Sequence, residues 1–215
     1  MSKLTENQVK ESYIQDTLNL VLDNYLIRRG VVAPFKFKGI DLELTARLGQ
    51  LLVQTGKDYG PSWELLLESA GPTWSWPDRI SPHTGLGIGS NGHDPGVLYQ
   101  VLLLLHIIMV NESGEVLDLL PGVWGSEFWQ QSELELENLP TGFGPINLKC
   151  QAMGKFIQLT YQPAYRIQPR KVRLRLGGRY RVVAADCEWI ENESYVELAT
   201  NFSYLRLERN RFESL

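Results

Sequence analysis

The spacing of hydrophobic residues changes near residue 114, and this change constrains the fold of the chain more than any other feature. Before it, apolar residues recur every three or four positions, as at Leu44 and Leu48, which is typical of an amphipathic helix. After it, apolar and polar residues alternate, as over residues 157–161, which is typical of a strand with one buried face. We therefore predict an α+β chain, helical over 1–113 and an antiparallel β-sandwich over 114–215.

Four helices are expected in the first segment. Their ranges, set by capping residues and by glycine stops, are about 5–29, 41–55, 61–70 and 94–110. The fourth begins at Asp94-Pro95, which suits an N-cap followed by the first helical position. It is apolar nearly all round, so it needs neighbours on several faces. This helix therefore predicts a larger helical assembly or an oligomer.

About eight short strands are expected in the second segment, and turn residues such as Met153-Gly154 separate them. One polar face on each strand is typical of an antiparallel sandwich. The alternating runs lie near residues 117–119, 134–136, 146–150, 157–161, 172–176, 180–182, 195–198 and 205–207.

Composition excludes several functional classes. The net charge of −4 argues against nucleic-acid binding, which needs a basic surface. The N-terminus lacks the apolar core of a secretory signal, and no run is long enough to span a membrane, so we expect a cytoplasmic protein without membrane contact. The two cysteines, Cys150 and Cys187, have no histidine at ligand spacing. We expect no metal site and no cofactor.

Residues 73–95 lie between the third and fourth helices and concentrate the polar and aromatic residues that carry chemistry. Trp74 and Trp76 could stack on sugar rings, although Trp also packs interfaces well. Asp78 is the best candidate catalytic carboxylate: Arg79 beside it would keep it ionised, as a base requires. A structural Asp–Arg pair is the alternative. No acid partner for Asp78 is visible in the sequence, although glycoside hydrolysis usually requires two carboxylates.

The two histidines of this stretch, His83 and His93, are ten residues apart in a glycine-rich loop. They could hydrogen-bond sugar hydroxyls, whereas their spacing matches no common metal motif. The glycines between them would let the backbone approach a ligand closely. They do not form a phosphate-binding loop, because the required Lys-Ser/Thr pair is missing.

The order of these motifs resembles a known family. The run T-W-S-W-P-D-R-I-S-P-H-T-G, then Gly92-His93, an apolar helix, L-L-P-G-V and P-T-G-F-G-P resemble the C-terminal part of large bacterial glycoside-hydrolase-like proteins. Those proteins carry a six-hairpin (α/α) toroid followed by a β-sandwich. The resemblance implies a partial, toroid-like helical array here, with Asp78 as catalytic residue and Trp74, Trp76, Arg79, His83 and His93 binding substrate.

The chain departs from the family pattern at its most important positions. Asp78 stands where the family has Glu, Arg79 where it has Ala, and Asp94 where it has a second His. The shorter Asp side chain withdraws the carboxylate, and catalysis is sensitive to displacements of about 1 Å. The chain would also supply only about the last third of the ring, so a second chain or self-association would have to complete it.

Two hypotheses follow. In the first, the protein is carbohydrate-related, and it binds or hydrolyses glycosidic substrates only with the missing helical portion. In the second, it is a non-catalytic binding or assembly module derived from such an enzyme. A second carboxylate close to Asp78 would favour the first hypothesis, and a large apolar patch on the helices would favour a missing partner.

Overall fold

The computed structural model describes residues 25–28, 31–34, 39–89, 92–123, 133–176, 180–192 and 194–209. The chain forms two compact units, Met1–Leu105 and His106–Leu215. The first contains helices with small sheets and the second contains two larger sheets. The predicted α+β class, with helices before a β-sandwich, is confirmed.

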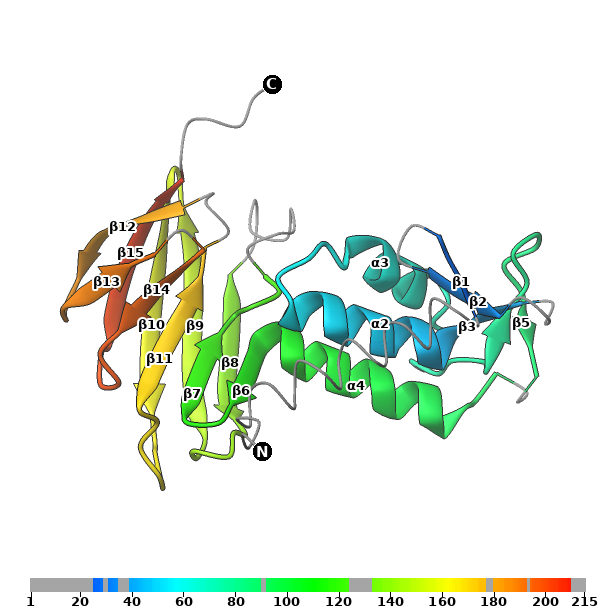
Figure 1. Ribbon diagram of the computed structural model, residues 1–215, viewed down its shortest axis with the longest axis horizontal. Helices are drawn as coiled ribbons and strands as arrows, with labels where there is room; N and C mark the ends of the chain where they lie inside the picture. Colours follow the sequence, from blue (N-terminus) through cyan, green and yellow to red (C-terminus); the bar gives the residue numbers. More distant parts are fainter. Residues whose placement is uncertain are drawn as a thin grey trace, which may run out of the picture. The chain divides into compact units, whose positions relative to one another are not determined.

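The first unit contains three helices and two small sheets among its described residues (Figure 1). The helices are α2 (Leu42–Gln54), α3 (Gly60–Glu68) and α4 (Pro95–Met109), the last of which ends in the second unit. A hairpin joins β1 (Tyr25–Arg28) to β2 (Val31–Pro34). The other sheet joins β3 (Ile40–Asp41), β4 (Arg79–Ile80) and β5 (Gly87–Ile88).

Helices α2 and α4 pack closely at a glycine. A Cβ atom on Gly49 would lie 2.9 Å from Cδ2 of Leu104, so a larger residue would push the helices apart. Beside this contact, the Gln50 side-chain amide donates to the backbone oxygen and to Oε1 of Gln100, each at 3.0 Å. The polar side chains at this helix contact are therefore paired. None of the helices in the described part of the chain is long and apolar enough to span a membrane.

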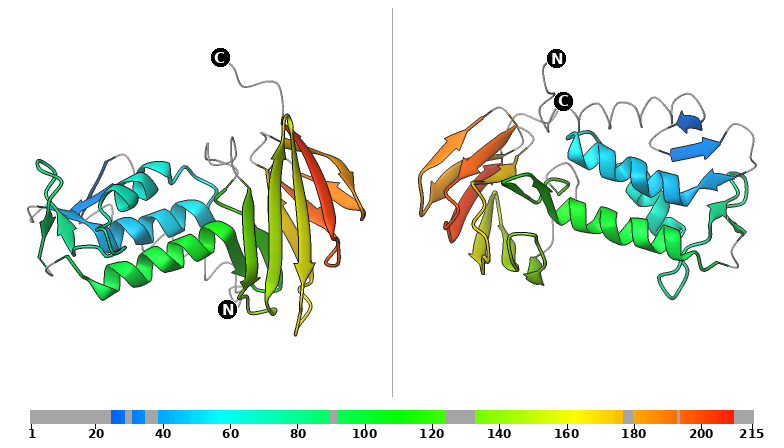
Figure 2. Two further views of the ribbon diagram at one scale, coloured as in Figure 1. Left: turned by 180° about the vertical axis from the view of Figure 1, so that it is seen from behind. Right: turned by 60° about the horizontal axis from the view of Figure 1, so that its bottom comes forward.

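The second unit is a sandwich of two five-stranded sheets (Figures 1 and 2). Their strand orders are β12-β15-β10-β9-β8 and β13-β14-β11-β7-β6. The strands are β6 (Val110–Ser113), β7 (Val116–Leu119), β8 (Leu134–Leu139), β9 (Ile146–Met153), β10 (Phe156–Pro163), β11 (Lys171–Arg175), β12 (Tyr180–Ala185), β13 (Trp189–Glu191), β14 (Tyr195–Leu198) and β15 (Tyr204–Arg209).

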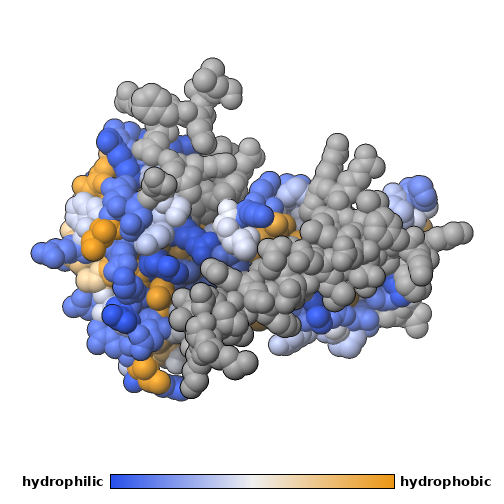
Figure 3. All heavy atoms as spheres, in the orientation of Figure 1, coloured by the Kyte–Doolittle hydropathy of each residue, from blue (hydrophilic) through white to orange (hydrophobic). Residues whose placement is uncertain are grey.

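Alternate residues of these strands form the sandwich core. In β9, for example, Leu148 and Cys150 are buried, while Asn147 and Lys149 are partly exposed. In the view of Figure 3, the coloured outer surface of the sandwich is mostly hydrophilic, with separate apolar residues. Fully buried core residues come from both sheets: Leu117, Leu119, Val172, Leu174 and Val196 from one, and Leu159, Tyr161, Leu205 and Leu207 from the other.

Some sequence expectations need correction. The predicted first helix lies mostly outside the described residues, but its end is wrong, because Tyr25–Arg28 form strand β1. The fourth helix ends at Met109, and Val110 begins strand β6. The sandwich is not purely antiparallel, since β7 and β11 are parallel. They can be parallel because β8, β9 and β10 cross to the other sheet before the chain returns.

The parallel pair carries a buried ion pair. Asp118 of β7 is fully buried and lies opposite Arg173 of β11. The Nε and Nη2 atoms of Arg173 donate to its two carboxylate oxygens at 2.7 and 3.1 Å, and Nη2 of Arg175 lies 3.7 Å from Oδ2. The two arginines therefore compensate the buried charge of Asp118.

We expect Asp118→Asn to destabilise the sandwich by about 3 kcal/mol, because the two arginines lose the charge that compensates them. Urea unfolding followed by circular dichroism measures this. Glu197→Gln is the control: it removes the more exposed Lys171–Glu197 pair of 2.9 Å in the same sheet and should cost less than about 1 kcal/mol. Equal losses in the two variants would contradict a special role for Asp118.

Candidate functional site

The pairing of β3 with β4 brings together charged residues that are far apart in the sequence. Asp41 is the partner of Arg79 in this register. The backbone N–H of Leu42 also donates to the backbone oxygen of Asp78 at 3.2 Å. The start of α2 and the loop that contains Asp78 therefore form one local structure.

Asp78 and Arg79 form a partly exposed ion pair. Nε of Arg79 lies 3.2 Å from Oδ2 of Asp78, and the two side chains are 33% and 35% exposed. The backbone of Gly89 lies against this carboxylate: a Cβ atom there would be 3.2 Å from Oδ2. Gly89 also has a φ of 88°, which favours glycine. The predicted Asp–Arg neighbourhood is thus a direct contact.

A second carboxylate, Asp41, lies near this pair. Its Oδ1 accepts the backbone N–H of Leu44 at 2.9 Å, which makes it the N-cap of α2. Burial, the largest cause, raises the pKa of Asp41, and the negative charges of Asp78 and Glu43 raise it further. The hydrogen bond from Leu44 and the charge of Arg79 lower the pKa, but the net shift is upward.

The start of α4 adds another carboxylate to the first unit. Oδ1 of Asp94 accepts the backbone N–H groups of Gly96 at 2.8 Å and Val97 at 3.0 Å, so the predicted N-cap is confirmed. A Cβ atom on Gly96 would lie 3.0 Å from Oδ1 of Asp94 and 3.3 Å from Oε2 of Glu43. Within the described ranges, no group of three or more His, Cys, Asp and Glu residues could hold a metal ion.

The two tryptophans have different environments. Trp76 is 3% exposed, and its indole N–H donates to the backbone oxygen of Leu66 at 2.7 Å, so it packs the loop against α3. Trp74 is 66% exposed and has a φ of 53°, which is uncommon for a large residue. The turn from Gly71 to Ser75 holds it: Gly71 N–H donates to Ser75 O at 2.7 Å.

The histidines are both exposed. His83 lies in the turn between β4 and β5, where Oγ of Ser81 accepts the backbone N–H groups of Thr84 at 3.3 Å and His83 at 3.4 Å. His93 precedes the N-cap of α4. Neither imidazole makes a hydrogen bond or an ion pair with another residue in the described ranges. That His83 and His93 contact a sugar stays a prediction.

The position of Asp41 beside Asp78 was not predicted from the sequence. A helix start was predicted at Asp41, but the proximity of Asp41 to Asp78 depends on two strands of only two residues each. Such strands are too short to show an alternating pattern. The structure therefore brings Asp41, Asp78 and Arg79 together, buries Trp76, and leaves Trp74 exposed in the same loop as Asp78.

Comparisons with protein-family models and with curated proteins find no match for this chain. Among solved structures, it is similar to a GH127 beta-L-arabinofuranosidase from Geobacillus stearothermophilus T6, at 10% sequence identity and a TM-score of 0.45. The match covers 95% of this chain and 39% of that chain. The similarity is distant, and this chain spans well under half of that protein.

We expect Asp78→Asn to lower the pKa of Asp41, because removing a nearby negative charge makes ionisation of Asp41 easier. A carbon-13 NMR titration of the aspartate carboxyl groups measures this pKa. Asp58→Asn is the matched control, since Asp58 is not among the charges that shift Asp41. An unchanged Asp41 pKa in Asp78→Asn, or an equal change in the control, would show that the two carboxylates do not interact.

Proposed function

We propose that this chain binds a carbohydrate at Trp74 and the neighbouring charged residues Asp78 and Arg79. The observation that carries this proposal is the exposure of Trp74, which is 66% exposed on a left-handed backbone within an ordered turn. The Trp74 ring centroid lies 6.5 Å from that of Trp76, but the exposed part of the indole gains no stability from burial. Backbone strain of this kind is often kept where it serves binding.

The chemistry around Trp74 suits a sugar. The flat, apolar face of an indole ring can stack on the C–H face of a pyranose or furanose ring. A carboxylate accepts hydrogen bonds from hydroxyl groups and a guanidinium donates to them. Asp78 and Arg79, four and five residues further along the chain than Trp74, supply one of each. Trp76 is buried, so its contribution is to hold this loop in place.

We further propose that hydrolysis requires a second polypeptide. Asp41, with its raised pKa, could serve as an acid, and Asp78 beside Arg79 could serve as a base, as glycoside hydrolysis requires. However, Asp41 already uses one oxygen to cap α2. The chain alone is therefore proposed to bind sugar, and cleavage is proposed only with the helical hairpins of a partner.

Trp74→Ala should weaken sugar binding at least about tenfold, which corresponds to about 1.4 kcal/mol. A panel of pentoses, hexoses and their disaccharides, screened by isothermal titration calorimetry, would identify the ligand and measure its affinity. Trp189→Ala is the matched control, because Trp189 is also exposed, at 40%, but belongs to the sandwich. Unchanged affinity in Trp74→Ala, or no binding of any sugar by the wild type, would refute the proposal.

A second candidate function is assembly, and one surface favours it. Four residues on one side of α4 are exposed: Leu98 at 37%, Tyr99 at 61%, Leu102 at 55% and Leu105 at 38%. The opposite side, including Val101 and Leu104, is buried. A run of exposed apolar side chains of this kind is typical of an interaction surface.

We propose that this face of α4 pairs with the same face of a second copy. The helix contains no Asp, Glu, Lys or Arg, so an antiparallel pair of α4 helices would place no like charges opposite each other. Leu98, Leu102 and Leu105 are spaced at i, i+4 and i+7, which forms a stripe that can complement itself about a two-fold axis.

We expect the wild type to form dimers as its concentration rises, and Leu102→Gln to stay monomeric, because the glutamine would be buried without a partner. Light scattering coupled to gel filtration measures both. Leu86→Gln is the control, since Leu86 is more exposed, at 69%, but lies on the β4–β5 hairpin. A wild type that is monomeric at every concentration would rule out the α4 pair.

A further inference from the structure

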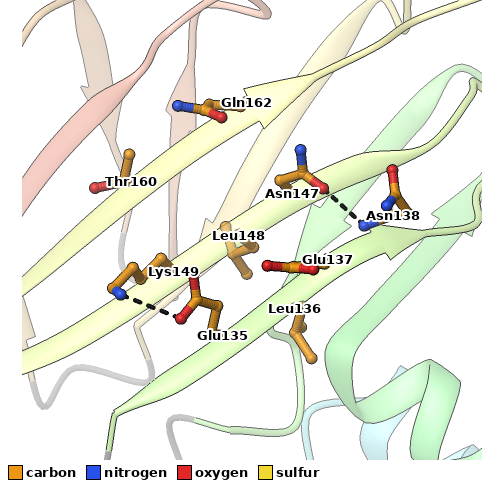
Figure 4. Close-up of a pocket in the computed structure, with 9 residues that line it drawn as sticks. All are labelled: Glu135, Leu136, Glu137, Asn138, Asn147, Leu148, Lys149, Thr160 and Gln162. Carbon is orange, nitrogen blue, oxygen red and sulfur yellow. Dashed lines mark hydrogen bonds and ion pairs between the residues drawn. The ribbon is translucent and has the colours of Figure 1, made fainter.

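A hollow of about 330 Å³ lies on the outer, polar face of the sandwich (Figure 4). Strands β8, β9 and β10, which neighbour one another in the sheet, form it. Its volume is at the lower end of the range of small-molecule sites. The residues that line it are Glu135, Leu136, Glu137, Asn138, Asn147, Leu148, Lys149, Thr160 and Gln162.

A β-bulge in β8 shapes the part of this hollow that is lined by Glu137, Asn138 and Asn147. Leu136 pairs with Leu148 and Leu139 with Ile146, so two residues of β8 lie opposite the single residue Asn147 of β9. One of the two, Asn138, has a φ of 52°. Such a bulge bends its strand and redirects side chains, and here it places Glu137 over the hollow (Figure 4).

A side-chain hydrogen bond fixes this bulge. The backbone N–H of Asn138 donates to Oδ1 of Asn147 at 2.7 Å. Because the amide oxygen of Asn147 is used in this way, its NH₂ group turns away from β8, as Figure 4 shows. Asn147 thus presents two donors beside Gln162, which is its cross-strand partner on β10.

At the part of the hollow lined by Glu135 and Lys149, the positive charge of Lys149 is compensated by two glutamates. Nζ of Lys149 lies 2.5 Å from Oε1 of Glu133 and 3.2 Å from Oε2 of Glu135. Thr160 is the cross-strand partner of Lys149 on β10. The Lys149 charge is already neutralised, so this part of the hollow does not select an anion.

The remaining polar groups are available to a ligand. Among the residues that the structure describes, the side chains of Glu137, Thr160 and Gln162 have no hydrogen-bond or ion-pair partner. Together with Asn147, they offer a carboxylate, a hydroxyl and two amides from three adjacent strands. This mixture of fixed donors and acceptors matches a ligand whose own groups both donate and accept, as hydroxyl groups do.

We propose that this hollow binds a short, neutral saccharide through the side chains of Glu137, Asn147 and Gln162. The ligand class rests on the proposed carbohydrate function, but the residues are separate from Trp74 and belong to the other compact unit. The carboxylate of Glu137 accepts from sugar hydroxyls, and the two amides donate to them.

NMR titration of the full-length, nitrogen-15-labelled chain tests this proposal. The probes are the disaccharides maltose, cellobiose and xylobiose, each added up to 50 mM. We expect at least one of them to shift the backbone amides of Glu137, Asn147 and Gln162 in a saturable way. No shift in β8, β9 or β10 with any probe would overturn the proposal.

Two matched variants identify the contact. Gln162→Ala should weaken the sandwich binding at least about fivefold, whereas Gln158→Ala should leave it unchanged. Gln158 lies on the same strand and face but does not line the hollow. Equal weakening in both variants would overturn the assignment.

The two proposals can fail separately. Trp74→Ala should leave the shifts in β8, β9 and β10 intact, because Trp74 is not part of the hollow. Shifts confined to residues 73–89 would overturn the sandwich site and leave the proposed function standing. Shifts confined to the hollow would support this inference and refute binding at Trp74.

Discussion

The pairing of β3 with β4 is the contact on which the candidate site depends. It consists of two residue pairs, Ile40 with Ile80 and Asp41 with Arg79, and it is extended by the hydrogen bond from Leu42 N–H to Asp78 O. Ile80 is 5% exposed, so the small sheet is anchored to the core of its unit. Without this pairing, the charges of Asp41 and Asp78 would have no reason to be neighbours.

The same small sheet explains why Asp41 both caps helix α2 and has a pKa that depends on the charge of Asp78. Asp41 is the last residue of β3 and the N-cap of α2. Capping satisfies a backbone N–H that the helix cannot pair internally. At the same time burial and nearby negative charge raise its pKa. The structural and electrostatic roles of Asp41 therefore cannot be separated by replacing Asp41 itself, whereas replacing Asp78 changes only the second.

Much of the fold could be predicted from the sequence, because long elements leave long patterns. Helices α2, α3 and α4 lie where period and capping residues placed them, and the eight alternating runs are all strands. No strand was predicted in the first unit, so β1 to β5 were missed there. In the second unit, strands β6 and β13 were missed. Strand β6 follows α4 without a break, and all three residues of β13 are exposed, so neither shows a two-residue period. Asp78 and Arg79 were predicted as neighbours, whereas Asp41 required the tertiary structure.

Hydropathy also could not tell which side of an apolar helix is covered. In α4, Val97 and Val101 are buried, while Leu98 and Leu102 are exposed, although all four are aliphatic. The sequence indicated correctly that the helix is apolar all round, but only packing decides which face α2 occupies. Gly49 and Gln50 determine this face, because Gly49 packs against Leu104 of α4 and Gln50 hydrogen-bonds to Gln100 of α4. On the opposite face, Leu98, Tyr99, Leu102 and Leu105 stay 37% to 61% exposed in the described part of the chain, and this exposure is the observation on which the proposed α4 pair rests.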